Sequence, residues 1–224
     1  MAFKTIYQPK INEIGVIRNL IEYEYFSGFA LSQKQKCIAS LHSAVEFQGI
    51  SNILEISSKS PVELGKKLSA FNLQFEINKI PYSVEQIFQA SKVFELGGPY
   101  LDLYNKTSKE AKMDERLKNS GKIVAFKFLD CNFPTQPYTF FYDWLYSNAL
   151  LENKGLLTNA LNYNAFSDIE FNEKKSLNCQ AYSLALFSSV CKNSKEILLK
   201  ESISKEEFLM LCKNEYNARW QTVK

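Results

Sequence analysis

Three polar side chains are spaced so that a helix would bring them together on one face. Glu85, Gln89 and Lys92 occupy positions i, i+4 and i+7 of a helix predicted from residue 83 to about residue 96. A carboxylate beside an amide and an amine could stabilise a cationic transition state or activate water. The alternative is a solvated stripe in which Glu85 is simply favoured by the positive end of the helix dipole.

Two aspartates are further candidates for acid–base chemistry. Asp143 is the only charged residue between Asp130 and Glu152, within a predicted apolar helix, and a carboxylate there is costly to bury unless it is paired or lines a cavity. Its neighbour Trp144 could be a core residue or a platform for a nucleobase. Asp168 follows a short apolar segment and could be catalytic, or could simply close a turn.

A lysine-rich segment provides the remaining candidates. Lys34 and Lys36 lie in the first turn of a helix that Ser32 is predicted to cap, shortly after Gly28 and Phe29. Positive charge at that end opposes the helix dipole, and such a local conflict can mark a functional site. Solvent-exposed lysines without a specific role are the alternative.

The elements that would position these residues predict a helix-rich α+β fold around a small sheet. We expect one domain over residues 1–224, with residues 193–224 as a C-terminal helical extension. Capping-box patterns begin helices at Ser83-x-x-Gln86 and Thr107-x-x-Glu110. Strands are expected at 15–25, 52–56, 73–77 and 123–128, the last of them buried, and helices from Ser32 and at 83–96, 107–121, 138–151, 178–190 and from 204. The helix at 138–151 is apolar nearly all round, which is typical of a central helix.

Composition excludes several classes of mechanism. His42 is the only histidine, so a zinc site built from several imidazoles is excluded. The five cysteines form no C-x-x-C pair, which favours reduced thiols in a cytoplasmic protein. No secretory signal or membrane-spanning run is visible. The net charge is +3, from 24 Lys and 3 Arg against 24 acidic residues, so a phosphate would have to be held by lysines or backbone amides.

Several segments resemble the motifs of the NADAR family. Phe26-Ser-Gly-Phe29 is similar to its F-S-N-F motif, and Ser83-Val-Glu-Gln-Ile-Phe-Gln-Ala-Ser-Lys92 is similar to its S-x-E-H-Y-F-Q-A-x-K signature. Thr107-Ser-Lys-Glu-Ala-Lys112 and Tyr142-Asp-Trp-Leu145 match later family segments, so the resemblance covers about residues 22–192. The chain departs from the family pattern at Gln86, where the family has His, and at Gly28, where it has Asn. Within the family, the chain is most similar to the antitoxins paired with DarT-type toxins.

The resemblance implies an enzyme that hydrolyses the N-glycosidic bond between ADP-ribose and guanine in DNA. Such an enzyme would be an antitoxin to a DarT-type DNA ADP-ribosyltransferase and would need neither cofactor nor metal. Glu85 and Asp168 would share the acid–base roles, with Asp143 as a third candidate. Lys34 or Lys36 could instead form a Schiff base with the ring-opened sugar. The substrate-binding residues would be Gly28, Phe29, Gln89, Lys92, Arg116, Trp144 and Asn178.

Two other functions remain compatible with the sequence. Some family members cleave the N-glycosidic bond of phosphoribosylated riboflavin-pathway intermediates, and the absence of a basic stripe mildly favours such a small substrate. A protein that binds ADP-ribose without cleaving it is the other alternative. The presence of Glu85, Asp143 and Asp168 argues for catalysis.

Overall fold

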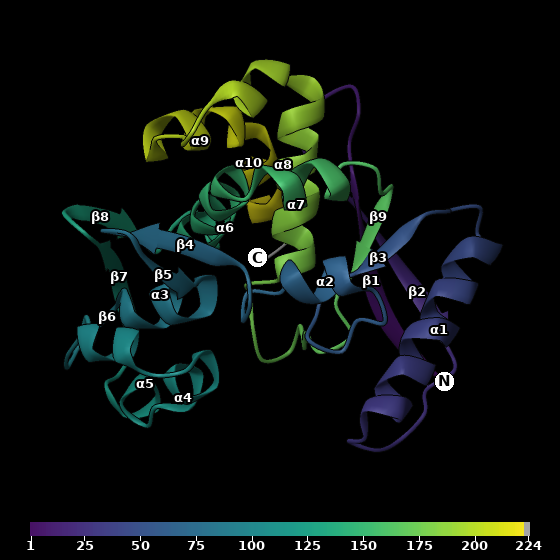
Figure 1. Ribbon diagram of the computed structural model, residues 1–224, viewed down its shortest axis with the longest axis horizontal. Helices are drawn as coiled ribbons and strands as arrows, with labels where there is room; N and C mark the ends of the chain where they lie inside the picture. Colours follow the sequence, from purple (N-terminus) through teal and green to yellow (C-terminus); the bar gives the residue numbers. More distant parts are fainter. Residues whose placement is uncertain (222–224) are drawn as a thin grey trace.

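The computed structural model describes residues 1–221, and its largest sheet joins three strands from the first quarter of the chain to one strand near residue 166 (Figure 1). The strand order is β2-β1-β9-β3, with β1–β2 and β1–β9 antiparallel and β9–β3 parallel. The strands are β1 (Ala2–Pro9), β2 (Val16–Tyr23), β3 (Ile53–Glu55) and β9 (Ala165–Ser167). The parallel pair aligns Glu55 with Ser167, so Asp168 leaves the sheet at the end where Glu55 lies.

Two long helices cover this sheet. Figure 1 shows α1 (Leu31–Phe47) on the outer side and α8 (Gln180–Asn193) on the side of the molecular centre. The buried positions of α1 recur with helical spacing, at Cys37, Ile38, Leu41 and Val45, as an amphipathic helix on a sheet requires. The helix begins after Ala30, which makes no side-chain cap hydrogen bond, so the expectation that Ser32 caps the helix is wrong; Ser32 lies inside the first turn.

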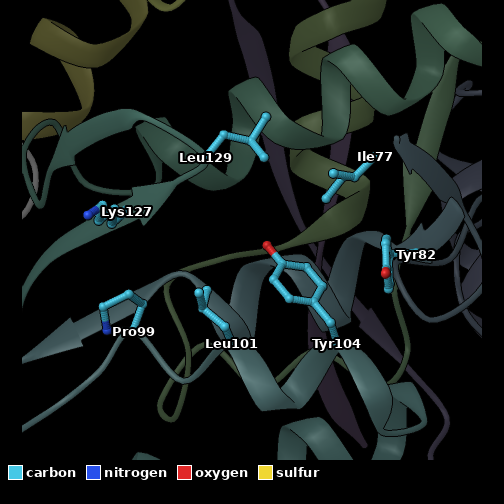
Figure 2. Close-up of a pocket in the computed structure, with 7 residues that line it drawn as sticks. All are labelled: Ile77, Tyr82, Pro99, Leu101, Tyr104, Lys127 and Leu129. Atoms are coloured by element: carbon cyan, nitrogen blue, oxygen red, sulfur yellow. The ribbon is translucent and has the colours of Figure 1, made fainter. Parts of the chain in front are cut away.

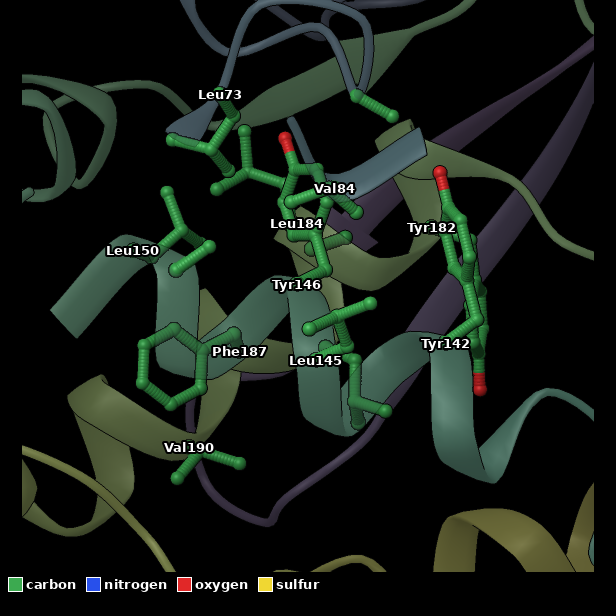
Figure 3. Close-up of a cluster of buried hydrophobic side chains, with 14 of the residues drawn as sticks. Leu73, Val84, Tyr142, Leu145, Tyr146, Leu150, Tyr182, Leu184, Phe187 and Val190 are labelled. Atoms are coloured by element: carbon green, nitrogen blue, oxygen red, sulfur yellow. The ribbon is translucent and has the colours of Figure 1, made fainter. Parts of the chain in front are cut away.

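The centre of the molecule is the pair of helices α8 and α6 (Phe140–Glu152). Nearly all side chains of α6 are buried, which confirms the expectation of a central helix. Figure 3 shows Leu145, Tyr146 and Leu150 of α6 among the side chains of α8. The Tyr146 hydroxyl donates a hydrogen bond to the Leu68 carbonyl oxygen at 2.6 Å, which satisfies the one polar atom that this side chain brings into the core.

A second group of small elements packs against the other side of α6. It contains the hairpin β4 (Gln74–Ile77) and β5 (Ile80–Ser83), and the antiparallel sheet β6 (Lys92–Phe94), β7 (Ile123–Phe128) and β8 (Cys131–Pro134). Its helices are α3 (Val84–Ala90), η1 (Leu101–Asn105), α4 (Ser108–Met113) and α5 (Arg116–Asn119). The strand expected at 123–128 is confirmed as β7, but the expectation that it is buried is wrong, because most of its side chains are exposed or half-buried.

Both predicted capping boxes are present, but the two helices that they begin are shorter than expected. Ser83 accepts a hydrogen bond from the Gln86 amide, and Thr107 accepts one from the Glu110 amide. The helix expected over 83–96 ends at Ala90, because Lys92–Phe94 pairs with β7 as a strand. The helix expected over 107–121 is interrupted after Met113 and continues as the separate α5.

The C-terminal residues are integral to the core. They form η2 (Lys195–Leu199), α9 (Lys205–Leu211) and α10 (Lys213–Gln221), and two further helices, α2 (Glu63–Lys67) and α7 (Lys154–Ala160), complete the structure. Phe208 and Tyr216 are buried in the main cluster of apolar side chains. No helix within residues 1–221 is both long and apolar enough to cross a bilayer.

The Asp143 carboxylate connects three helices inside this core. It accepts hydrogen bonds from Ser183 of α8 at 2.6 Å, from Tyr216 of α10 at 3.1 Å and from Thr139 at 2.7 Å. It is fully buried, and burial raises its pKa to about 6 although these hydroxyls and the charge of Arg219 act in the opposite direction. The side chain therefore has a structural role in holding α6, α8 and α10 together.

We expect Asp143→Ala to lower the free energy of unfolding at pH 7.5 by about 2–4 kcal/mol, because three buried hydroxyls lose their acceptor. Urea unfolding followed by circular dichroism measures the change. Asp130→Ala, at an exposed aspartate, is the matched control and should change stability by less than about 0.5 kcal/mol. Equal effects of the two substitutions would contradict the structural role.

Candidate active site

A cleft of about 420 Å³ opens between the group of small elements and the loop that follows β9. Its volume lies in the range of small-molecule sites, which is about 300–1,000 Å³. One wall comes from α3, β6, α4 and α5, and the other from residues 168–178 and the beginning of α8. The lining residues are Phe71, Glu85, Phe88, Gln89, Lys92, Lys112, Leu117, Tyr142, Asp168, Glu170, Phe171, Asn172, Lys175, Ser176, Asn178 and Gln180. Five of the residues predicted from sequence are among them.

Glu85, Gln89 and Lys92 form a continuous hydrogen-bonded chain along one wall. The Gln89 amide donates to Glu85 Oε1 at 2.8 Å, and the Lys92 ammonium donates to Gln89 Oε1 at 2.6 Å. The helix ends before Lys92, yet the three side chains still point the same way. The Glu85 side chain is 4% exposed. Besides the Gln89 amide it has a cationic neighbour, Lys112, whose Nζ lies 3.5 Å from Glu85 Oε1. An amide donor and an ammonium are the partners that stabilise an ionised carboxylate.

Lys92 is placed where its amine can lose a proton near neutral pH. Its Nζ lies over the Phe88 ring, 4.6 Å from the centroid. Burial lowers the pKa of Lys92 to about 8; the charge of Lys112 acts in the same direction, and Glu85 partly offsets both. A substantial fraction of this lysine is therefore the neutral, nucleophilic amine at pH 7.5 to 8.

Asp168 lies on the opposite wall in a tight turn. Its Oδ1 accepts hydrogen bonds from the backbone amides of Glu170 and Phe171, both at 3.1 Å. The side chain is 5% exposed. Burial, followed by the charge of nearby Glu55, raises the pKa of Asp168 to about 7, against the lowering effects of Lys4, Gln180 and the turn amides. At neutral pH this carboxyl is therefore protonated for much of the time and can act as an acid.

Aromatic side chains form the apolar surfaces of the cleft. Tyr142 packs edge-on against Phe88, with ring centroids 5.0 Å apart, and Phe71 and Phe171 complete the set. Flat apolar surfaces beside charged groups suit a nucleobase or a ribose. Trp144, expected to provide this surface, lies outside the cleft because its indole N–H donates to the Ile203 carbonyl at 2.8 Å and its rings pack on Phe133.

Two other residues predicted from sequence, Asp143 and Arg116, have their partners outside the cleft. Asp143 is sealed in the core and does not line the cleft. Arg116 donates to the carboxylates of Asp102 and Asp114 and stacks on Tyr100, and this pairing holds the pKa of Asp114 well below its usual range. The structure therefore does not bring these two residues to the site.

The segment around the first motif lies next to the cleft and contributes none of its lining residues. Lys34 forms an ion pair with Glu170, a residue of the cleft wall, at 3.0 Å, and this contact raises the pKa of Lys34. A lysine held in this way is a poor nucleophile. Lys36 is exposed, and Phe29 is 99% exposed beyond Gly28, whose φ of +125° favours glycine.

The structure adds residues that the sequence analysis did not select. Lys112 lines the cleft from the Thr107–Lys112 motif, so its motif could have identified it. Gln180 lines it from the start of α8, donating to the Ile56 carbonyl and accepting from the Ala70 amide, both at 2.6 Å. Glu55 lies behind Asp168. The only sequence signal for Glu55 was a charged residue inside a short apolar strand.

A second, smaller pocket of about 210 Å³ lies between η1 and the strands β5 and β7. Figure 2 shows Tyr82 and Tyr104 on one side of it and Leu129 on the other. Apart from Lys127 its lining is apolar or aromatic, and it includes none of the predicted site residues. Among residues 1–221, no group of three or more His, Cys, Asp or Glu side chains is arranged to hold a metal ion.

Comparison with known families agrees with the motifs in the cleft walls. The model of the NADAR-DarT1 family, described as DarT1-associated NADAR antitoxin, matches residues 2–222. The chain belongs to this family. The match extends beyond the segment expected from the motifs and includes both β1 and the C-terminal helices. NADAR proteins are generally N-glycosidase-like hydrolases, and this family is associated with DarT1 toxins. None of the curated proteins compared matches the chain.

The lowered pKa of Lys92 can be measured directly. After reductive methylation with ¹³C-formaldehyde, we expect the dimethyl-lysine signal of Lys92 to titrate with a midpoint near pH 8, because the buried amine disfavours its charged form. That signal should be missing in Lys92→Arg and present in Lys127→Arg, whose lysine lies on the adjacent exposed strand. The absence of any signal that titrates near pH 8 and is missing in Lys92→Arg would contradict the lowered pKa of Lys92.

Proposed function

We propose that this NADAR antitoxin hydrolyses the N-glycosidic bond between ADP-ribose and guanine in DNA, and so reverses the modification made by its DarT1 toxin. The observation that carries the proposal is the position of Glu85 and Asp168. Both are buried carboxyl side chains, they come from elements far apart in sequence, and they line one cleft with aromatic and lysine side chains. The family match supports the pairing with a toxin.

The environments of the two carboxyls suggest how they divide the reaction. Asp168, with its raised pKa, donates its proton to the guanine as the bond from C1′ to the base nitrogen breaks and its electron pair moves to the base. Glu85, beside Lys112 and Gln89, acts as the carboxylate that stabilises the oxocarbenium-like transition state and takes the proton of the attacking water. Water therefore adds to C1′ and guanine leaves protonated.

The same cleft provides a covalent route through a lysine. The sequence suggested Lys34 or Lys36 for a Schiff base. Lys92, whose pKa burial lowers, lines the cleft, whereas Lys34 is held as an ammonium by Glu170. Attack of the neutral amine on C1′ would break the bond to guanine, which leaves with a proton, and opening of the ribose ring would give an imine between C1′ and the lysine. Water would then hydrolyse the imine, which frees the amine and releases ADP-ribose. Borohydride added during turnover distinguishes the routes, because it traps an imine as a stable adduct on Lys92 and leaves the direct route without an adduct.

Binding of a single modified nucleotide suits both the cleft and the modest charge. Lys92, Lys112 and Lys175 line the cleft and can contact a diphosphate, while Tyr142 and Phe171 offer surfaces for a base or a ribose. A net charge of +3 is compatible with an extruded nucleotide held in a pocket and few phosphate contacts outside it.

We expect the wild-type protein to release ADP-ribose from an oligonucleotide that carries ADP-ribosyl-guanine, and Glu85→Gln to reduce kcat at least about 100-fold, because the amide cannot accept the proton of water. Release is measured by chromatography of the products. Glu63→Gln, at an exposed glutamate on α2, is the control and should keep wild-type activity.

Other outcomes separate the remaining functions. Turnover of a phosphoribosylated pyrimidine with no release from the oligonucleotide would contradict the proposal and favour a flavin-precursor N-glycosidase. A thermal shift with ADP-ribose, together with intact modified oligonucleotide after prolonged incubation, would favour a non-catalytic binder.

A further inference from the structure

Glu55 is bound to both residues that flank Asp168 in the chain. Ser167 donates its hydroxyl proton to Glu55 Oε2 at 2.5 Å, and the Ile169 amide donates to Glu55 Oε1 at 2.8 Å. Glu55 is 1% exposed at the end of β3, and it does not line the cleft. It therefore holds the start of the Asp168 turn from behind and cannot touch a substrate.

A second contact fixes the other end of the same turn. Lys4 of β1 donates from its ammonium to the carbonyl oxygens of Ile169, at 3.3 Å, and Phe171. Inside the turn, Asp168 accepts from the amides of Glu170 and Phe171. A buried carboxylate and a lysine thus hold the backbone from the sheet side, while Asp168 faces the cleft.

The hydrogen bonds also determine the state of His42. Its Nε2 lies 2.9 Å from Ser167 Oγ. Because the single proton of Ser167 goes to Glu55, His42 must be the donor, which requires the tautomer with the proton on Nε2. Burial lowers the pKa of His42 to about 4, so this imidazole is neutral at pH 7 and adds no positive charge beside Glu55.

Among the groups that act most strongly on Asp168, Glu55 is the acidic one, and Glu85 faces Asp168 from the opposite wall of the cleft. The other titratable groups that interact with Asp168 are Lys4 of β1, Tyr142 and Tyr146 of α6, and Cys179 before α8. The tyrosines and the cysteine are neutral near pH 7 because burial raises their pKa values. Two carboxyl groups in one buried region disfavour double ionisation, so they hold a proton between them. Burial raises the pKa of Glu55 as well, but its donors Ser167 and Ile169 and the charge of Lys4 act in the opposite direction and favour its ionised form.

We propose that Glu55 is a positioning residue for Asp168: it fixes the turn through Ser167 and Ile169, and its negative charge keeps the catalytic proton on Asp168. This role rests on the proposed function, in which Asp168 is the acid. The proton that protonates the leaving guanine is then available at neutral pH because Glu55 disfavours its loss from Asp168 to water.

Glu55→Gln tests the role, because glutamine has nearly the same shape and keeps an oxygen acceptor but carries no charge. Without that charge Asp168 loses its proton more easily. We expect the alkaline limb of the profile of kcat/KM against pH to move down by about one pH unit. Activity should fall about tenfold at pH 8 and stay within about threefold of wild type at pH 5.5. An unmoved alkaline limb would overturn the proposal.

Glu215→Gln is the matched control for lost stability. Glu215 is also buried, accepts a backbone N–H from Val16 at 3.2 Å, and pairs with Arg18, but it is not among the groups that act on Asp168. Its substitution should lower the unfolding temperature and leave the pH profile in place. A shift of equal size in both variants would show a merely structural effect and overturn the proposal.

A second measurement does not depend on turnover. The chain has only five aspartates, so ¹³Cγ labelling of Asp gives few signals, and Asp168→Asn identifies the one that matters. Its titration midpoint should fall in Glu55→Gln and stay unchanged in Glu215→Gln. A midpoint that falls in a protein inactive on modified DNA supports the coupling and refutes the proposed function alone. A midpoint unchanged by Glu55→Gln overturns the coupling.

Discussion

The structure depends on how it accommodates acidic side chains in an apolar interior. Within residues 1–221, five of them are buried: Glu55, Glu85, Asp143, Asp168 and Glu215. Each would destabilise the fold if it were left without donors, since an unpaired buried charge is among the most unfavourable features a core can contain. Their partners come from elements far apart in the sequence. Satisfying these groups therefore constrains how the sheet, the central helices and the C-terminal helices pack.

The five acidic side chains differ in their hydrogen-bond donors and in their access to the cleft. These differences distinguish the residues that stabilise the fold from those that a substrate could contact. Asp143 has three hydroxyl donors, and Glu215 has the guanidinium of Arg18, the Tyr182 hydroxyl and a backbone amide. Both are sealed inside the protein. Glu85 and Asp168 instead face one cleft, where a substrate can reach them. Glu55 shares features of both groups: it is buried away from the cleft, yet it is hydrogen-bonded to the turn that carries Asp168.

Local rules explain what could be predicted from sequence. The spacing of Glu85 and Gln89, together with the capping box before them, correctly placed both side chains on one face, because these features depend only on neighbours within a turn. The length of that helix was not predictable, since Lys92–Phe94 becomes a strand through pairing with residues about 30 positions later. The α+β class and the central apolar helix followed from patterning alone.

The errors came from residues whose partners are distant in the chain. Asp143 was a reasonable candidate because a carboxylate in an apolar helix often marks a site. Its hydroxyl donor Tyr216 lies 73 residues away, and no local pattern announces it. Glu55 was missed for the same reason, since its link to Asp168 exists only because β3 and β9 pair in parallel. Sequence motifs therefore identify residues whose partners are close in the chain, whereas the topology of the fold determines which buried acidic side chains lie near one another.

The same reasoning accounts for the scarcity of arginine at the cleft. Arg18 pairs with Glu215, and Arg116 pairs with Asp102 and Asp114. Arg219 donates to Thr139 and lies over the Tyr182 ring. An always-charged, planar guanidinium suits such structural pairs. Because all three arginines serve the fold, the positive charge that lines the cleft comes from lysines. Lysine, unlike arginine, can have its pKa lowered enough to become a nucleophile, so a cleft equipped in this way can contact a diphosphate and still present a neutral amine.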